Sequence, residues 1–128
     1  MILCDVDFFK SFNDRYGHDT GDRVLRMVAR TLAHNCRPYD VAGRWGGEEF
    51  LIIAGQTPDQ ELRRLAERLR ALVEQSQLTL EAQSVGVTIS IGATPARPDD
   101  DPNRLLKRAD ELLYRSKAEG RNRVTFEV

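Results

Sequence analysis

Two adjacent glycines near the middle of the chain constrain its fold more than any other feature. Gly46 and Gly47 separate two short strand-like runs, Val41–Trp45 and Phe50–Ala54. Paired glycines between such runs are a strong signal of a tight hairpin, because glycine adopts backbone angles that other residues avoid. We therefore predict that the chain reverses its direction at Gly46.

The rest of the chain is predicted to alternate strands with helices. The apolar run Met1–Val6 and the alternating residues of segments 85–91 and 124–128 are typical of strands. Helical spacing between capping and stop signals predicts four helices, over residues 8–16, 19–37, 58–73 and 102–119. This order predicts an α+β domain whose helices cover one face of a largely antiparallel sheet.

Three local features add detail to this prediction. Thr57 predicts a capping box at the start of the third helix. Segment 95–102 contains three consecutive aspartates and is expected to be a mobile loop. We expect Trp45, Phe8 and Phe9 to pack in the core rather than to stack on bases.

The composition limits the classes of function. A chain of 128 residues with 41% hydrophobic side chains can bury one core, which predicts a single domain. A formal net charge of -1 would not gather nucleic acid or an acidic membrane surface, so we expect contact with neither. Two cysteines and no bilayer-length apolar stretch are typical of a cytoplasmic domain, alone or as the cytoplasmic part of a larger sensor protein.

Four acids are predicted to gather at one end of the sheet. Asp5 and Asp7 come at the end of the first strand, and Glu48 and Glu49 follow the glycine turn. Clustered carboxylates repel one another unless a cation compensates them, and Mg²⁺ commonly takes one or two carboxylates plus substrate phosphates. A magnesium-nucleotide site is one interpretation, and a solvated sheet edge is the other. The glycines favour the first, because they let backbone approach a bulky ligand.

The residues around these acids resemble the GGDEF domains of bacterial diguanylate cyclases. The signature of that family stands here in its glutamate variant, Arg44-Trp45-Gly46-Gly47-Glu48-Glu49-Phe50. Further matches at the family's spacing are Asp5-Val6-Asp7-Phe8-Phe9-Lys10, Asn13-Asp14, Tyr16-Gly17-His18, Gly21-Asp22, Ser90-Ile91-Gly92, Ala109-Asp110, Tyr114, Lys117 and Gly120-Arg121-Asn122-Arg123. The resemblance implies a ferredoxin-like, palm-like nucleotide cyclase sheet, mostly antiparallel, with helices packed on it.

The resemblance also implies an activity. Such domains condense two GTP molecules into cyclic di-GMP and release two pyrophosphates. The implied cofactor is Mg²⁺, two ions per active site, with Mn²⁺ as a substitute. Because each domain resembles half of a reaction chamber, two copies must face each other, so a homodimer is expected. An upstream sensor domain is expected in a longer parent protein.

Individual roles follow from the matched positions. The implied metal ligands are Asp5, the backbone carbonyl of Val6, Glu48 and, at a second metal position, Glu49. Glu48 is also the implied base that deprotonates the attacking 3′-hydroxyl. The implied substrate contacts are Asn13 and Asp22 at the guanine edge, Lys10, Lys117 and Arg121 at the phosphates, and Gly46 and Gly47 in the turn.

Several of these residues also have an ordinary structural interpretation. Asp22 lies in the first turn of a predicted helix, and Lys117 and Arg121 flank the end of another, where the helix dipole favours their charges. Asn13 is also typical of a helix end that needs unusual backbone angles. The sequence pattern alone leaves both interpretations open.

An Arg-x-x-Asp string precedes the glycine turn. Arg37 and Asp40 stand where the family places an inhibitory site that binds the product, with Arg68 as a candidate second arginine. Arginine pairs with phosphate in bidentate fashion, and aspartate accepts hydrogen bonds from a guanine edge. An ion pair at a helix end is the alternative.

The chain departs from the family pattern at its beginning. Residues 1–128 are expected to form a single GGDEF catalytic domain that lacks the usual N-terminal helix and Asp-x-Leu-Thr-Gly-Leu segment. Two rival functions therefore stay open. One is a non-catalytic receptor for GTP or cyclic di-GMP, and the other is a structural or dimerisation module whose acids decorate the surface.

Overall fold

Strand β1 (Ile2–Val6) is the middle strand of a five-stranded sheet in the computed structural model, which describes all 128 residues. The sheet has the order β2-β3-β1-β6-β7. Its other strands are β2 (Val41–Arg44), β3 (Glu49–Ile53), β6 (Ile89–Ala93) and β7 (Val124–Phe126). All neighbouring pairs are antiparallel except β6 and β7, which are parallel. The predicted α+β fold with a mostly antiparallel sheet is confirmed.

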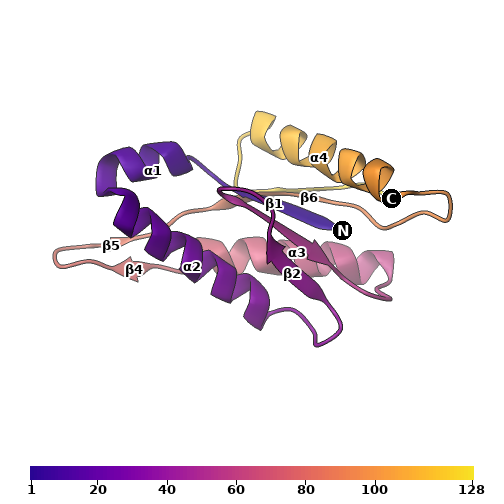
Figure 1. The fold of residues 1–128 in the computed structure, drawn as a ribbon, viewed down its shortest axis with the longest axis horizontal. Helices are drawn as coiled ribbons and strands as arrows, with labels where there is room; N and C mark the ends of the chain where they lie inside the picture. Colours follow the sequence, from indigo (N-terminus) through magenta and orange to yellow (C-terminus); the bar gives the residue numbers. More distant parts are fainter.

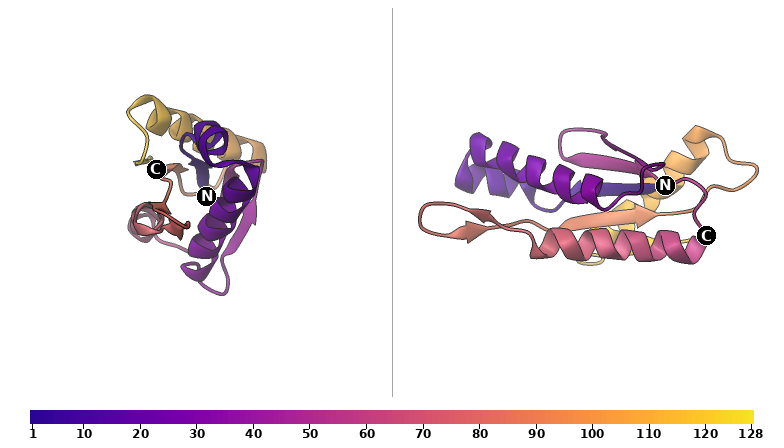
Figure 2. Two further views of the ribbon diagram at one scale, coloured as in Figure 1. Left: turned by 90° about the vertical axis from the view of Figure 1, so that its left-hand side faces the viewer. Right: turned by 90° about the horizontal axis from the view of Figure 1, so that it is seen from below.

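Four helices pack on this sheet. They are α1 (Phe9–Tyr16), α2 (His18–His34), α3 (Asp59–Gln75) and α4 (Pro102–Ala118). Figures 1 and 2 show α4 on the opposite side of the sheet from α2 and α3. None of the helices combines the length and the apolar character that a bilayer-spanning segment needs.

Helices cover both faces of the sheet, so the expectation of one covered face is wrong. Ile2 and Cys4 of β1 belong to the main core with apolar residues of α2 and α3. Leu3 points the other way and packs against Ala109 and Leu113 of α4. All five residues of β1 are buried. A strand without an exposed face requires cover on both sides of its sheet.

The predicted hairpin is confirmed, because β2 and β3 pair from Val41 opposite Ile53 to Arg44 opposite Phe50. The strand predicted over residues 85–91 is instead divided. Its first part is β5 (Ser84–Val85), which pairs with β4 (Leu78–Thr79) in a ribbon that extends beyond the sheet (Figure 1). An alternating sequence pattern does not reveal which partner each part of a strand will find.

The capping box expected at Thr57 is also wrong. Helix α3 begins at Asp59, and no side chain caps its first turn. The Thr57 hydroxyl donates instead to the carbonyl oxygen of Gly55, at 2.9 Å, and accepts a hydrogen bond from Arg37. A partner 20 residues away has taken the place of the local cap.

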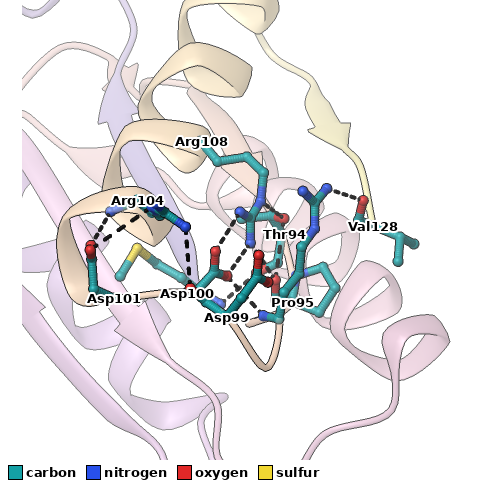
Figure 3. A network of polar contacts seen from close by, with 10 residues as sticks. Thr94, Pro95, Asp99, Asp100, Asp101, Arg104, Arg108 and Val128 are labelled. Atoms are coloured by element: carbon teal, nitrogen blue, oxygen red, sulfur yellow. Dashed lines mark hydrogen bonds and ion pairs between the residues drawn. The ribbon is translucent and has the colours of Figure 1, made fainter.

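Segment 95–102, expected to be a mobile loop, is fastened by a polar network (Figure 3). Asp100 forms an ion pair with Arg108 at 2.6 Å, and Arg108 also donates to the hydroxyl of Thr94 at 2.8 Å. Asp101 caps α4 by accepting from the backbone N–H of Arg104 at 2.8 Å. The aspartates therefore anchor the start of α4, which is an arrangement that N-terminal helix positions favour.

Gly92 in β6 determines how closely α4 approaches the sheet. A Cβ at this position would lie 2.2 Å from the carbonyl oxygen of Ala109 and 2.4 Å from the backbone nitrogen of Leu113. Both atoms belong to the α4 backbone, so they cannot move without shifting the helix.

We predict that Gly92→Ala lowers the free energy of unfolding by about 3 kcal/mol or more, as overpacking against backbone does. Urea denaturation followed by circular dichroism measures the change. Gly43→Ala is the matched control, because a Cβ at Gly43 in β2 meets nothing within 4 Å. Equal denaturation midpoints for the two variants would contradict this account of the α4 packing.

Candidate active site

The two aspartates at the end of β1 are each compensated by a cation from the end of α4. Asp5 is 5% exposed and forms an ion pair with the Nζ atom of Lys117. Asp7 is 4% exposed, and Nη1 of Arg121 lies 3.9 Å from its Oδ1. Because a buried charge without a partner is strongly destabilising, these contacts hold the end of α4 against the sheet.

Asp7 is occupied by structural contacts. Its carboxylate accepts hydrogen bonds from the hydroxyls of Thr88 and Ser90, at 2.7 and 2.6 Å, and from the backbone N–H of Asn122 at 2.9 Å. The expectation that Asp7 joins the other acids is therefore wrong. Asp7 joins β1, β6 and the turn after α4.

The other three acids do come together. Asp5 of β1 pairs in register with Glu49 of β3, and the backbone N–H of Val6 donates to the carbonyl oxygen of Glu48 at 3.1 Å. Burial raises the pKa of both glutamates, and the neighbouring charge of Asp5 raises each pKa further against the opposing effect of Lys117. Three carboxyl groups thus share one lysine, which leaves the site short of positive charge.

This donor set is suited to a magnesium ion. No three side chains of His, Cys, Asp and Glu already form a metal-binding cluster. Mg²⁺, however, usually binds through one or two carboxylates and completes its octahedron with water and phosphate oxygens. Asp5 and Glu48, beside the main chain of Val6, supply oxygen donors of that kind, and their neighbouring negative charges suit a cation.

The glycines of the turn are not required by the chain itself. Neither Gly46 nor Gly47 has a positive φ angle, and a Cβ at Gly47 would meet nothing within 4 Å. Arg44 holds the turn by donating from Nε to the carbonyl oxygens of both glycines, each at 3.1 Å. The expected need for glycine to bend the backbone is therefore wrong, and open space lies in front of Gly47.

Two aromatic residues expected in the core are exposed. Phe8 is 64% exposed and Trp45 is 53% exposed, whereas Phe9 is buried as expected. Phe8 and Arg121 both adopt left-handed backbone angles, with φ of 55° and 64°, and the guanidinium carbon of Arg121 lies 4.6 Å from the centroid of the Phe8 ring. Strained backbone of this kind is concentrated at functional sites.

Of the two residues predicted to contact guanine, Asn13 lies in α1 and Asp22 near the start of α2. Asp22 lines a groove of about 440 Å³ between α2 and β2, which Arg44 also lines. The Oδ1 atom of Asn13 is buried without a hydrogen-bond partner. An added Cβ at Gly21 would lie 1.8 Å from that atom, so the glycine makes room for Asn13 beside Asp22. Lys10 of α1 is exposed and makes no hydrogen bond or ion pair.

The Arg-x-x-Asp residues lie elsewhere, in a separate pocket of about 270 Å³. Arg37, Arg64 and Arg68 all line this pocket. The Asp40 side chain is fully buried and accepts from the backbone N–H groups of Arg37 and Gly55, at 2.8 and 3.2 Å. Asp40 therefore orients the loop that carries Arg37 and does not line the pocket.

Three contributions were missed by the sequence prediction. The hydroxyl and backbone partners of Asp7, the brace that Arg44 forms across the turn, and the place of Arg64 in the arginine pocket all depend on tertiary contacts. Only Arg64 carried a usable signal, because residues four apart on a helix share a face and Arg68 was already a candidate.

The family model for the diguanylate cyclase GGDEF domain matches residues 1–123. Among curated proteins, the response regulator PleD of Caulobacter vibrioides is 48% identical over 126 residues, which are 96% of this chain and 28% of that protein. Diguanylate cyclase A of Treponema denticola is 41% identical over 127 residues, which are 98% of this chain and 34% of that protein. The chain thus spans about a third or less of these relatives.

Solved structures agree with these matches. The diguanylate cyclase SiaD of Pseudomonas aeruginosa, crystallised with its activator SiaC, superposes with a TM-score of 0.94 at 40% identity, covering 98% of this chain and 48% of that one. The GGDEF domain of DgcB from Caulobacter crescentus, crystallised with c-di-GMP, gives a TM-score of 0.92 at 36% identity, covering 98% and 75%.

We predict that Glu48→Gln stabilises the chain in the absence of divalent cations. The pKa of Glu48 is higher in the folded chain than in the unfolded chain, so its ionisation lowers the free energy of unfolding. This loss develops as the pH rises above the ordinary pKa of glutamate. The gain at pH 7, for this half-exposed group, is about 0.5 kcal/mol and disappears below about pH 4. Thermal unfolding at both pH values measures it.

Glu111→Gln is the matched control, because Glu111 is an exposed acid of α4. Adding Mg²⁺ should raise the melting temperature of the wild-type chain more than that of Glu48→Gln. If both glutamine variants are stabilised equally, or if the stabilisation does not depend on pH, then burial and neighbouring charges do not destabilise the ionised form of Glu48.

Proposed function

The chain belongs to the family of diguanylate cyclase GGDEF domains, and we propose that it condenses two GTP molecules into cyclic di-GMP with release of two pyrophosphates. One observation carries the proposal. Glu48 and Glu49 meet Asp5 at the same end of the sheet to which α4 brings Lys117 and Arg121. Acidic side chains that can bind metal ions therefore lie beside basic side chains that can bind phosphates. Phosphoryl transfer needs this arrangement.

We assign the metal positions to Asp5, the Val6 carbonyl, Glu48 and Glu49. Bound Mg²⁺ ions offset charge on the attacking and leaving oxygens of the transfer. Glu48 has a further role as the base that accepts the proton of the 3′-hydroxyl. Its place beside Asp5, at the end of the sheet where the substrate phosphates are proposed to lie, supports that role.

The cations of α4 are assigned to the phosphates. Lys117 pairs with Asp5, and its partly exposed ammonium group would be available to a phosphate oxygen of the substrate. Arg121 is held over Phe8 and beside Asp7, so its guanidinium is oriented before substrate arrives. Lys10 is an exposed residue of α1, two residues after Phe8. We assign it as the third phosphate contact.

Guanine recognition is assigned to Asn13 and Asp22. The buried Oδ1 of Asn13 lacks a partner within the chain, and such a group is stabilised by a ligand that donates to it. The open space in front of Gly47 supports close approach of a substrate to the turn, since the chain itself does not require glycine there. The second GTP is presented by a second copy of the domain, so catalysis requires a homodimer.

Incubation of the purified chain with GTP and Mg²⁺ tests the activity. We expect cyclic di-GMP and pyrophosphate in a ratio of one to two, and a rate at least about 100-fold lower for Asp5→Asn, as loss of one charge-stabilising group produces. Glu111→Gln should retain the wild-type rate. Binding of GTP without pyrophosphate release would favour the receptor function, and no binding would favour a structural module.

We further propose that the arginine pocket binds the product and inhibits turnover. Arg37 and Arg68 face one hollow, and their guanidinium groups suit paired phosphate oxygens. Asp40 fixes Arg37 through its buried hydrogen bonds. The DgcB relative crystallised with c-di-GMP makes a product complex of this chain a reasonable proposal.

Arg37→Ala and Arg68→Ala should each raise the cyclic di-GMP concentration that halves the rate by roughly 10-fold or more, from the loss of charge-assisted hydrogen bonds. Arg68 offers the cleaner test, because its only hydrogen bond is to the carbonyl oxygen of Asn35. Arg63→Ala, an exposed arginine of α3 outside the pocket, is the control. Unchanged inhibition in both test variants would refute the inhibitory site.

A further inference from the structure

Arginines without carboxylate partners gather where α2 and α3 meet. Many arginines elsewhere form ion pairs, as Arg70 does with Glu67 and Arg108 with Asp100, whereas Arg15, Arg44, Arg63 and Arg97 stand singly without one. Five arginines of this region have no carboxylate oxygen within 4.0 Å: Arg23, Arg26, Arg30, Arg64 and Arg68. On a chain with a formal net charge of -1, this concentration is local and not a consequence of overall composition.

Three of these arginines line a hollow that is distinct from the groove beside Asp22, although Arg26 lines both. The hollow has a volume of about 600 Å³ and lies between α2 and the start of β4. Arg23, Arg26, Arg30 and His34 surround it, Met27 and Leu78 add apolar surface, and no acidic residue lines it. Asn35, at the end of α2, borders both this hollow and the arginine pocket around Arg37.

Three arginines of this helix face repel one another, although Asp19 and Asp22 stand four residues before Arg23 and Arg26. Residues 23, 26, 30 and 34 follow helical spacing, so their side chains lie along one side of α2. Like charges three or four residues apart destabilise a helix. An anion seated among them would replace this repulsion with charge-assisted hydrogen bonds, which for guanidinium and phosphate oxygens are often bidentate.

The shape of the hollow selects among anions. Its volume falls in the range of small-molecule sites, which combine apolar surface with a few directed polar groups. Peripheral binding to a membrane instead needs an apolar face that projects into the lipid, and a concave cationic surface does not provide one. Met27 and Leu78 offer contact for a base while the arginines hold its phosphates.

We propose that this hollow is a second anion site, which binds the phosphate groups of a nucleotide. It lies on α2, borders the pocket of Arg37 at Asn35 without containing Arg37, and goes beyond the proposed cyclase activity. Phosphate is the shared chemistry of the two candidate sources, a nucleoside triphosphate and a cyclic dinucleotide.

Amide chemical shifts of the ¹⁵N-labelled chain test the proposal. The probes are inorganic pyrophosphate, GTP without Mg²⁺, and cyclic di-GMP, each titrated separately. Saturable shifts are expected at residues 23–34 and 77–78 with at least one nucleotide. Saturation by pyrophosphate alone identifies the polyphosphate as the recognised group, whereas tighter binding of cyclic di-GMP identifies the dinucleotide.

The double variant Arg23→Ala, Arg30→Ala should weaken the affinity read at these amides by roughly 10-fold or more, because two charge-assisted contacts are lost. Arg63→Ala should leave this affinity unchanged. Arg30→Lys keeps the charge, and its affinity should lie between that of the wild-type chain and that of the double variant. The dispersion of each spectrum shows that the variant is folded.

Shifts confined to residues near Lys117 or Arg37, or an affinity that the double variant does not change, would overturn the second site. The amide shifts report binding whether or not the chain turns over GTP. Failure of this proposal is therefore distinguishable from failure of the cyclase proposal.

Discussion

Charge compensation at the end of β1 links the fold to the candidate active site. Asp5 and Asp7 lie in the interface between the sheet and α4. Asp5 pairs with Lys117, and Asp7 contacts Arg121 and the backbone N–H of Asn122. Removing one partner of a buried charge pair destabilises a protein by roughly 3–5 kcal/mol. The same contacts that fix the end of α4 therefore bring the cations of the candidate site beside its acids.

Close packing between α4 and β6 makes this charge compensation possible. Gly92 lets the α4 backbone approach β6, and the Ser116 hydroxyl donates to the carbonyl oxygen of Ile91 at 2.7 Å. Lys117 follows Ser116 and so reaches Asp5 on the neighbouring strand. On the other side of β1, the hairpin adds Glu48 and Glu49, whose raised pKa values mark the remaining excess of negative charge.

Cations of this chain divide into two groups with different consequences. Paired arginines such as Arg108 fasten segments whose acids would otherwise repel one another. Unpaired arginines lie together where α2 meets α3, around Arg30 in one hollow and around Arg68 in another. Arginines thus gather locally on a chain whose total charge is close to zero.

The sequence by itself determined the four helices, the hairpin at Gly46, the family and the matched positions, because periodicity, turn residues and motif spacing are local properties. Only the tertiary structure decided which faces of the sheet are covered. It also decided that Asp7 is a structural residue while Asp5 lies beside the glutamates, and that Thr57 accepts a hydrogen bond from Arg37 instead of capping a helix. Each of those outcomes depends on partners distant in sequence, as with Asp7 and Ser90, which are 83 residues apart. Local patterns contain no information about such contacts, because packing of several elements selects them together.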